Sequence, residues 1–146
     1  MIKVCLVGSD VDKEFALLQT QYNITVAKMA EKSFDDLLLQ IVSENPDVLV
    51  ISDAMSSLSA DDLCLYVSLQ IPSAKTVIIT DKPASYERLE LSGFACRGFI
   101  TYEQRHAIVR AVKVVHDGES WIPRKLVSDV LDRLASQTKH TQNSLV

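Results

Sequence analysis

The sequence predicts a single α/β domain built on a doubly wound, five-stranded parallel sheet with helices on both faces. Short runs rich in Val and Ile alternate along the chain with segments whose apolar residues recur at helical spacing. Two of these runs, 48–51 and 77–79, are apolar without alternation, which is typical of strands covered on both faces. The length of 146 residues also fits one compact domain. The predicted strands are, in order, 2–7, 24–29, 48–52, 76–80 and 98–100.

Helices are predicted between these strands and after the last one. A Ser or Thr followed three residues later by an acidic or amide residue is typical of a helix start, because the hydroxyl accepts a hydrogen bond from the backbone N–H three residues on. Such pairs are Ser33 with Asp36, Ser59 with Asp62, and Thr101 with Gln104. We expect the first two helices to end before Pro46 and Pro72, and the third to run to His116. Residues 12–21 and 84–91 fill the other two gaps.

Composition and charge argue against several classes of protein. Fifteen Lys and Arg against nineteen Asp and Glu give a net charge of -4, the wrong sign for a surface that binds nucleic-acid phosphates. The cysteines Cys5, Cys64 and Cys96 lie far apart in apolar runs, so we expect buried, reduced thiols and no zinc site. Residues 1–7 lack a signal-peptide pattern, and no run approaches the ~20 apolar residues of a membrane span. We therefore expect a cytoplasmic protein with no membrane partner.

In a sheet of this type, the loops at the carboxyl ends of the strands form the functional surface. These loops are predicted at residues 8–10, 52–55, 80–82 and 101–103. The chain has four glycines, and none of the loops is a Gly-rich phosphate loop, so a dinucleotide site is not expected. All three histidines follow the last predicted strand and are expected to face solvent, which argues against a Ser-His-Asp arrangement. The sequence therefore predicts a domain that is not an enzyme.

Five short motifs occur in order on this strand pattern. They are Pro46-Asp47-Val48 at the third strand, Met55 after it, Thr80 at the end of the fourth, Gly98-Phe99-Ile100 as the fifth, and the run from Asp117 to Arg124. With these motifs, residues 1 to about 135 resemble a response-regulator receiver domain of the LuxR/NarL type. The resemblance implies a flavodoxin-like, CheY-like sheet of order 2-1-3-4-5 with an extra C-terminal helix. It also implies a role in two-component signal transduction, with a histidine kinase as a partner.

The resemblance also assigns the positions of the phosphorylation site. A working receiver has an aspartate nucleophile, two acidic residues that hold Mg²⁺, a Ser or Thr, and a Lys, because phosphoryl oxygens must be neutralised by cations. Here the phosphoacceptor position falls on Ser52, the acidic pair on Gly8 and Ser9, and the Lys position on Tyr102. Thr80 matches the family, as does the switch aromatic at Phe99. The implied site is degenerate, with no metal and no catalytic residue.

A shift of one residue gives an alternative interpretation. Asp53 would then be the phosphoacceptor, and Ser9 and Asp10 would lie in the Mg²⁺-binding loop. Even in this register no Lys appears at the required position. Adjacent strand residues also point to opposite sides, so Ser52 and Asp53 cannot both enter one pocket from a regular strand.

A second alternative concerns Trp121 and Arg124. The segment resembles the Trp-x-x-Arg motif with which the CsgD-type branch of LuxR regulators binds cyclic di-GMP, and it departs from that motif at Ile122 and Pro123. A Trp ring and an Arg are chemically suited to a nucleotide phosphate or guanine. The competing interpretation is that Trp121 anchors the last helix and Arg124 is solvated.

The predicted helix 101–116 has an apolar arc wider than the stripe of about 100° that a surface helix needs. Val109 and Val114 flank its expected core stripe, which consists of Ile108, Ala111, Val112 and Val115. The extra apolar surface predicts a second contact. One candidate is a homodimer through Val109 and Val114. The other is cover by the last helix, through Val127, Val130, Leu131 and Leu134.

We expect three segments: a receiver domain at 1–120, a linker helix at 121–135 and a polar linker at 136–146. The resemblance implies that such a linker leads to a helix-turn-helix domain, for which the last residues are too few. DNA would be bound only through that absent domain, and a natural stand-alone receiver is the alternative. The combined hypothesis is an atypical, phosphorylation-independent signal-input domain that controls dimerisation and a downstream DNA-binding domain.

Overall fold

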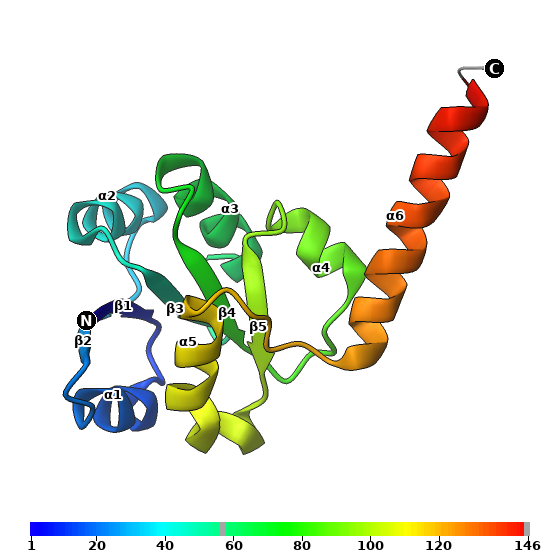
Figure 1. The fold of residues 1–146 in the computed structure, drawn as a ribbon. Helices are drawn as coiled ribbons and strands as arrows, with labels where there is room; N and C mark the ends of the chain where they lie inside the picture. Colours follow the sequence, from blue (N-terminus) through cyan, green and yellow to red (C-terminus); the bar gives the residue numbers. More distant parts are fainter. Residues whose placement is uncertain (56–57, 145–146) are drawn as a thin grey trace.

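The computed structural model describes residues 1–55 and 58–144, which form a five-stranded sheet with helices on both faces (Figure 1). The strand order is β2-β1-β3-β4-β5, and every pair of neighbours is parallel. The strands are β1 (Ile2–Val7), β2 (Ile24–Met29), β3 (Val48–Ser52), β4 (Lys75–Ile79) and β5 (Cys96–Ile100). The doubly wound sheet of order 2-1-3-4-5 is therefore confirmed.

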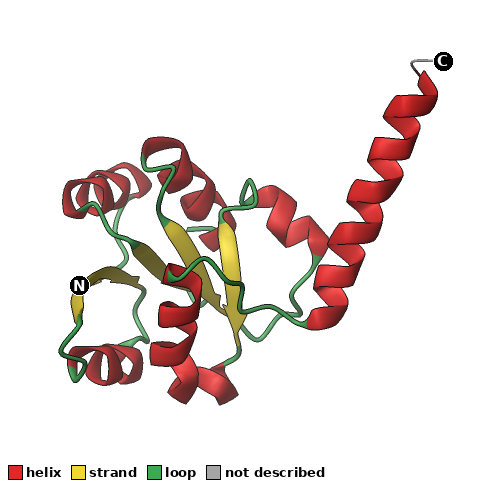
Figure 2. Ribbon diagram, viewed as in Figure 1, coloured by secondary structure: helices red, strands yellow, loops and turns green. Residues whose placement is uncertain are grey.

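The helices form a layer on each side of the sheet (Figure 2). One layer consists of α1 (Asp12–Gln19) and α5 (Ile108–His116), and the other of α2 (Phe34–Glu44), α3 (Ala60–Gln70) and α4 (Tyr86–Leu91). A 3₁₀ helix, η1 (Tyr102–Ala107), precedes α5. The last helix, α6 (Arg124–Ser144), extends away from the body of the domain.

Burial follows from this arrangement. β3 is fully buried and β1 and β4 nearly so, because each lies between two other strands and under two helical layers. The predicted core stripe of α5 is buried, and so are all three cysteines. The three histidines are exposed, as expected.

Helix caps agree with the sequence at two of the three predicted sites. The hydroxyls of Ser33 and Ser59 each accept a hydrogen bond of 3.3 Å from the backbone N–H three residues on. The prediction at Thr101 was wrong: its side chain makes no cap bond, and its carbonyl accepts from the N–H of Gln104 at 3.0 Å. This i→i+3 bond belongs to η1, so the predicted helix 101–116 is a 3₁₀ helix followed by a shorter α-helix.

Several predicted boundaries differ from the structure by a few residues. β4 spans Lys75–Ile79 instead of 76–80, and β5 begins at Cys96, two residues before the predicted start. Pairing with the neighbouring strand sets these ends, and Cys96 pairs with Thr76 across an irregular register. α1 ends at Gln19 and α4 begins at Tyr86, each two residues inside the predicted helix. The apolar runs therefore predicted where the strands lie, and pairing between neighbouring strands determines where β4 and β5 begin and end.

α6 departs most from the sequence prediction. It packs against α4 through the buried Leu126 and the half-buried Val130, so the alternative in which this helix covers α5 was wrong. It also continues to Ser144 through residues expected to be a polar linker, of which 145–146 lie outside the described residues. Polar residues such as Gln and Lys support a helix without any apolar periodicity, so the sequence pattern gave no signal. Among the described residues, no helix is long and apolar enough to cross a membrane.

Candidate functional site

Two polar clusters lie at the carboxyl ends of the central strands. In the first, Ser52 at the end of β3 is 1% exposed, and its Oγ lies 2.8 Å from the hydroxyl oxygen of Tyr102 on η1. The N–H of Ala54 donates a hydrogen bond of 3.3 Å to the same Oγ. Residues 50 positions apart in the sequence, which the resemblance assigns to the phosphoacceptor and Lys positions, are therefore in direct contact.

Gly8, in the loop after β1, lies close to Ser52 of this first cluster. Its φ of +140° is a conformation that side-chain-bearing residues rarely adopt. A Cβ at this position would lie 2.8 Å from the Cβ of Ser52 and 3.3 Å from a methyl group of Val11. The resemblance places an acidic residue here, and in this backbone conformation any side chain at position 8 would be strained and crowded against Ser52. The next two residues of the loop, Ser9 and Asp10, are exposed.

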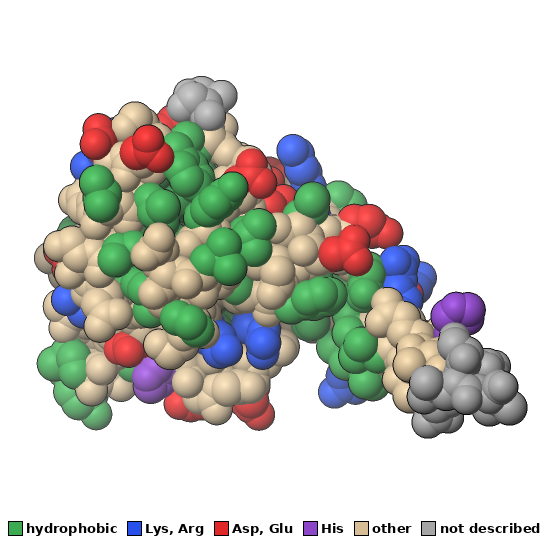
Figure 3. All heavy atoms as spheres, turned by 90° about the horizontal axis from the view of Figure 1, so that it is seen from above, with side chains coloured by type: hydrophobic (Ala, Val, Ile, Leu, Met, Phe, Trp, Pro, Cys, Tyr) green, Lys and Arg blue, Asp and Glu red, His purple; other side chains and the backbone are tan. Residues whose placement is uncertain are grey.

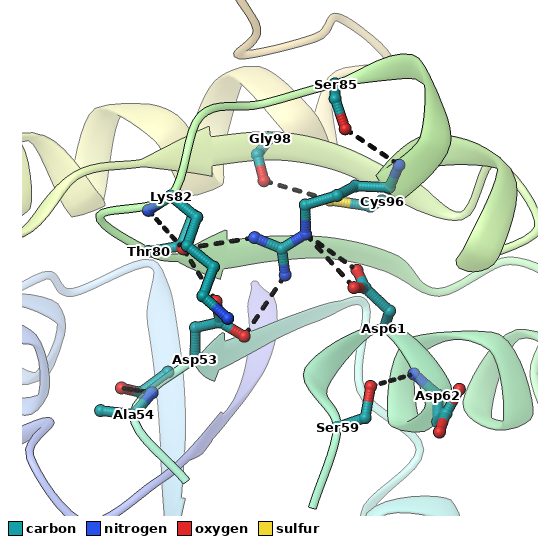
Figure 4. Close-up of polar contacts among 12 residues, drawn as sticks. Asp53, Ala54, Ser59, Asp61, Asp62, Thr80, Lys82, Ser85, Cys96 and Gly98 are labelled. Carbon is teal, nitrogen blue, oxygen red and sulfur yellow. Dashed lines mark hydrogen bonds and ion pairs between the residues drawn. The ribbon is translucent and has the colours of Figure 1, made fainter.

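The second cluster surrounds the guanidinium group of Arg88 on α4. Its partners Asp53, Asp61 and Thr80 converge from different elements in Figure 4. Arg88 donates to Asp53 Oδ1 at 3.3 Å, to both oxygens of Asp61 at 3.2 and 3.3 Å, and to Thr80 Oγ1 at 3.2 Å. Its guanidinium carbon lies 5.4 Å from the centre of the Phe99 ring. The Arg88 side chain is 11% exposed and the two carboxylates 15%, so water screens these charges weakly.

Thr80 belongs to this second cluster and uses its hydrogen-bonding capacity fully. Its hydroxyl donates to Asp53 Oδ2 at 2.8 Å and accepts from Arg88 and from the N–H of Lys82 at 3.0 Å. Both carboxylate oxygens of Asp53 therefore have partners. Ser52 and Asp53 take part in different clusters, as expected for adjacent residues on a strand.

A third group of charges fixes η1 to α1. Glu14 on α1 is fully buried, and Arg105 on η1 donates to its two carboxylate oxygens, one of them at 3.0 Å. Arg105 also donates to the backbone carbonyl of Asp10 at 2.9 Å and stacks 5.3 Å from the centre of the Tyr102 ring. The hydrogen bond from Arg105 to Glu14 raises the pKa of this guanidinium. The ion pair thereby holds Tyr102 over Ser52.

Arg88, Asp61, Glu14 and Arg105 were missed by the sequence analysis. Glu14 occurs in an ordinary amphipathic helix, and nothing in its local pattern distinguishes a buried acid from an exposed one. One feature of the sequence could have indicated the position of Arg88: it lies three residues after Ser85, whose hydroxyl caps α4 by accepting a hydrogen bond from the Arg88 N–H. That cap fixes the start of α4 and thereby directs Arg88 toward the strand ends.

The acidic residues of the alternative Mg²⁺ site are separated. Asp53 faces Arg88, and Asp10 is 70% exposed with its carboxylate 3.8 Å from Arg105. Among residues 1–55 and 58–144, no group of three or more His, Cys, Asp or Glu side chains is arranged to hold a metal ion. The carboxylates that a cation would need therefore already face guanidinium groups.

Trp121 and Arg124 lie outside both clusters. The backbone of Trp121 pairs with β5: its N–H donates to the carbonyl of Arg97 at 2.8 Å, and its carbonyl accepts from Phe99 at 3.0 Å. Arg110 of α5 stacks 5.8 Å from its ring. The ring also lines a pocket of ≈ 300 Å³, of which Arg124, exposed at the start of α6, is not part.

The residues predicted to form a dimer contact are half-buried on α5. Val109 packs against the core on the α1 and α5 side of the sheet, and Val114 retains part of its surface. Because α6 packs on α4, it does not supply the intrachain cover that was one of the two candidates for this surface.

Comparison with known proteins finds similar solved structures but no similar sequences. No family model matches the sequence, and no curated protein sequence is similar enough to match. A two-component response regulator of the LuxR family from Aurantimonas sp. SI85-9A1 matches with a TM-score of 0.71 at 12% identity, over 92% of this chain and 99% of its own. The signal receiver domain of the response regulator NarL from Mycobacterium tuberculosis gives 0.65 at 19% identity, over 81% and 98%.

The isolated receiver domain of RcsB from Salmonella enterica serovar Typhimurium, in the presence of phosphomimetic BeF₃⁻, gives a TM-score of 0.67 at 13% identity. The match covers 87% of this chain and 96% of that domain. Identities this low establish a shared fold. The fold is that of response-regulator receiver domains, and LuxR- and NarL-type regulators are among its structural neighbours.

Proposed function

We propose that this chain, with its receiver fold, is the signal-input domain of a LuxR/NarL-type transcriptional regulator and works without phosphorylation. The observation that carries the proposal is the bond between Ser52 and Tyr102, which are 2.8 Å apart at the positions where the family has an aspartate and a lysine. Phosphoryl transfer to a carboxylate requires a nucleophile and cations that neutralise the phosphoryl oxygens. This pair supplies neither a carboxylate nor a cation, since both groups are hydroxyls that are hydrogen-bonded to each other.

Gly8 supports the same proposal independently. With the backbone in this conformation, the Cβ of an acidic residue at position 8 would lie 2.8 Å from the Cβ of Ser52, so this loop does not present a Mg²⁺-binding acid from that position. The output would then be set by dimerisation and by the placement of a DNA-binding domain beyond α6. A histidine kinase, if it binds this domain, would act by contact and not by phosphoryl transfer to Ser52.

Phosphoacceptance by Asp53 is the second candidate. The 2.8 Å bond between its carboxylate and the hydroxyl of Thr80 favours it, because Thr80 matches the family position. Arg88 opposes it by occupying the other carboxylate oxygen, at 3.3 Å. An attacking carboxylate would have to leave both partners.

Phosphorylation and metal binding can be tested together. We expect no phosphoryl adduct by intact mass when the protein is incubated with acetyl phosphate and Mg²⁺. Millimolar Mg²⁺ alone should leave the amide shifts of Gly8 and Ser52 unchanged. Ser52→Ala and Asp53→Asn are the matched variants. A stable adduct that persists in Ser52→Ala and disappears in Asp53→Asn would establish the second candidate.

Binding of cyclic di-GMP near Trp121 is a separate proposal, supported by the pocket of ≈ 300 Å³ that Trp121 lines; Arg124 is exposed and does not line that pocket. Titration with the dinucleotide while following Trp121 fluorescence tests it. No change in fluorescence, or the same change in Arg124→Ala, would argue against a site built on these residues.

A further inference from the structure

We infer that α4 is a mechanical link between the Arg88 cluster and α6, and that Arg88 is the positioning residue that keeps α6 docked on the domain. This coupling goes beyond the proposed function, because it depends on neither phosphorylation nor a DNA-binding domain. It rests on contacts made by different faces of one very short helix.

α4 has six residues, Tyr86–Leu91, which is too short for its own backbone hydrogen bonds to stabilise it. Contacts with the rest of the molecule must therefore determine its position. Toward the sheet these contacts belong to Arg88, whose guanidinium reaches Asp53, Thr80 and Asp61. Asp53 follows β3, Thr80 follows β4, and Asp61 lies on α3. One side chain therefore fixes α4 to three separate parts of the domain.

The residues on either side of Arg88 hold α6. The guanidinium carbon of Arg133 on α6 lies 4.1 Å from the centre of the Tyr86 ring, and Arg133 Nη2 lies 3.4 Å from a carboxylate oxygen of Glu87. Tyr86 and Leu89 are buried in the same apolar cluster as Leu126 of α6. α4 is thus the helix that α6 packs on most extensively.

Beyond Arg133 the side chains of α6 from 134 to 141 are exposed. Figure 3 shows α6 leaving the body of the domain, with apolar side chains along the part of the helix nearest to it. The direction of this 21-residue helix is therefore set near its first three turns, at α4. A shift of α4 at Arg88 would be carried along the whole length of α6.

Cys96 provides a probe for this docking. It is 1% exposed and lines a groove under α6 with Leu89, Ile122 and Val130. Its thiol should react with iodoacetamide when α6 and α4 separate. Cys5, buried in β1, should react only when the whole domain unfolds. The ratio of labelling rates at Cys96 and Cys5, measured by peptide mass spectrometry, therefore reports local undocking corrected for global stability.

Arg88→Met removes the cluster and keeps the length of the side chain. We expect it to raise the Cys96-to-Cys5 ratio by about tenfold, because several hydrogen bonds to charged groups that fix α4 are lost. Arg105→Met is the matched control: it removes another largely buried guanidinium, paired with Glu14, on the opposite face of the sheet. We expect this control to change the ratio less than about twofold. If Arg88→Met proves unfolded, Asp61→Asn weakens the same cluster more mildly and should shift the ratio in the same direction.

A double-mutant cycle with Arg88 and Arg133 tests whether the two residues act on the docking of α6 together or independently. Arg133→Met should also expose Cys96, because it breaks the contact between α6 and α4 directly. If Arg88 acts through α4, the two effects are not independent, and the double variant should raise the ratio by much less than the product of the single effects. A ratio unchanged in Arg88→Met and in Asp61→Asn, or effects that multiply, would overturn the inference.

Discussion

Replacement of Gly8 by Ala is the most direct test of how the first cluster is built. The new Cβ would lie 2.8 Å from the Cβ of Ser52, which is too close for any real contact, and Ser52 is buried at the end of a central strand and cannot retreat. The backbone at φ +140° adds a second penalty, of about 1–3 kcal/mol for a residue with a side chain. Overpacking of a buried site costs a further ~1–3 kcal/mol.

The two costs sum to about 2–6 kcal/mol, against a total stability of roughly 5–15 kcal/mol for a natural domain. For a chain of this size the melting temperature should fall by roughly 10 °C. Urea unfolding followed by circular dichroism gives the free energy. Gly118→Ala is the matched control, because Gly118 also has positive φ (+93°) but no atom lies within 4 Å of its would-be Cβ. That control should cost about 1 kcal/mol, from the backbone alone.

A rescue variant isolates the steric part. Ser52→Gly removes the Cβ that the new methyl group would meet, so Gly8→Ala should cost less in a Ser52→Gly background than in the wild type. Equal costs for Gly8→Ala and Gly118→Ala, or no relief in the Ser52→Gly background, would refute the reasoning that contact with Ser52 disfavours a side chain at position 8.

Two further predictions concern association and pH. If the protein is a homodimer through α5, replacing both Val109 and Val114 by Glu should give a folded monomer in sedimentation experiments. The control Leu39→Glu places one such charge on the exposed face of α2 and should leave the dimer intact. A wild-type protein that is monomeric at tens of micromolar would contradict the dimer. Burial raises the pKa of Cys5 to about 12 and of Cys64 to about 11. Thiols of the unfolded chain ionise near pH ~8.5, so above that pH the folded state binds more protons than the unfolded state. The free energy of unfolding should therefore fall as the pH rises toward ~11, by up to ~1.4 kcal/mol per pH unit for each thiol. Urea titrations between pH 8 and 11, at roughly one-unit steps, should show a shallower slope for Cys64→Ala, and an identical slope would exclude that thiol as a contributor.

The sequence predicted the fold well because the fold depends on local apolar patterns. The central strands are Val- and Ile-rich runs buried on both faces, and Ser33 and Ser59 cap their helices through bonds within one turn. Thr101 shows where this reasoning fails. The pattern of a cap was present, but the segment after it is held by Arg105 against α1, nearly a hundred residues away in the sequence.

The candidate site shows the same division. The sequence pattern singled out Ser52 and Tyr102, which the structure brings into contact, because their places at strand ends follow from the order of the elements. It could not predict the Arg88 cluster. The carboxylate partners of Arg88 are 27 and 35 residues away, and a charged residue on a surface helix usually reaches only water.

The backbone pairing of Trp121 with β5 affects how the sheet meets other molecules. A five-stranded open sheet has two edge strands, here β2 and β5, and unpaired backbone groups at an edge can template the addition of a foreign strand. Trp121 occupies the middle of the β5 edge, where it satisfies the N–H of Phe99 and the carbonyl of Arg97. On β2, Lys28 carries a charge and pairs with Asp12. One edge is therefore blocked by the chain itself and the other is protected by charge, which should disfavour growth of the sheet into aggregates.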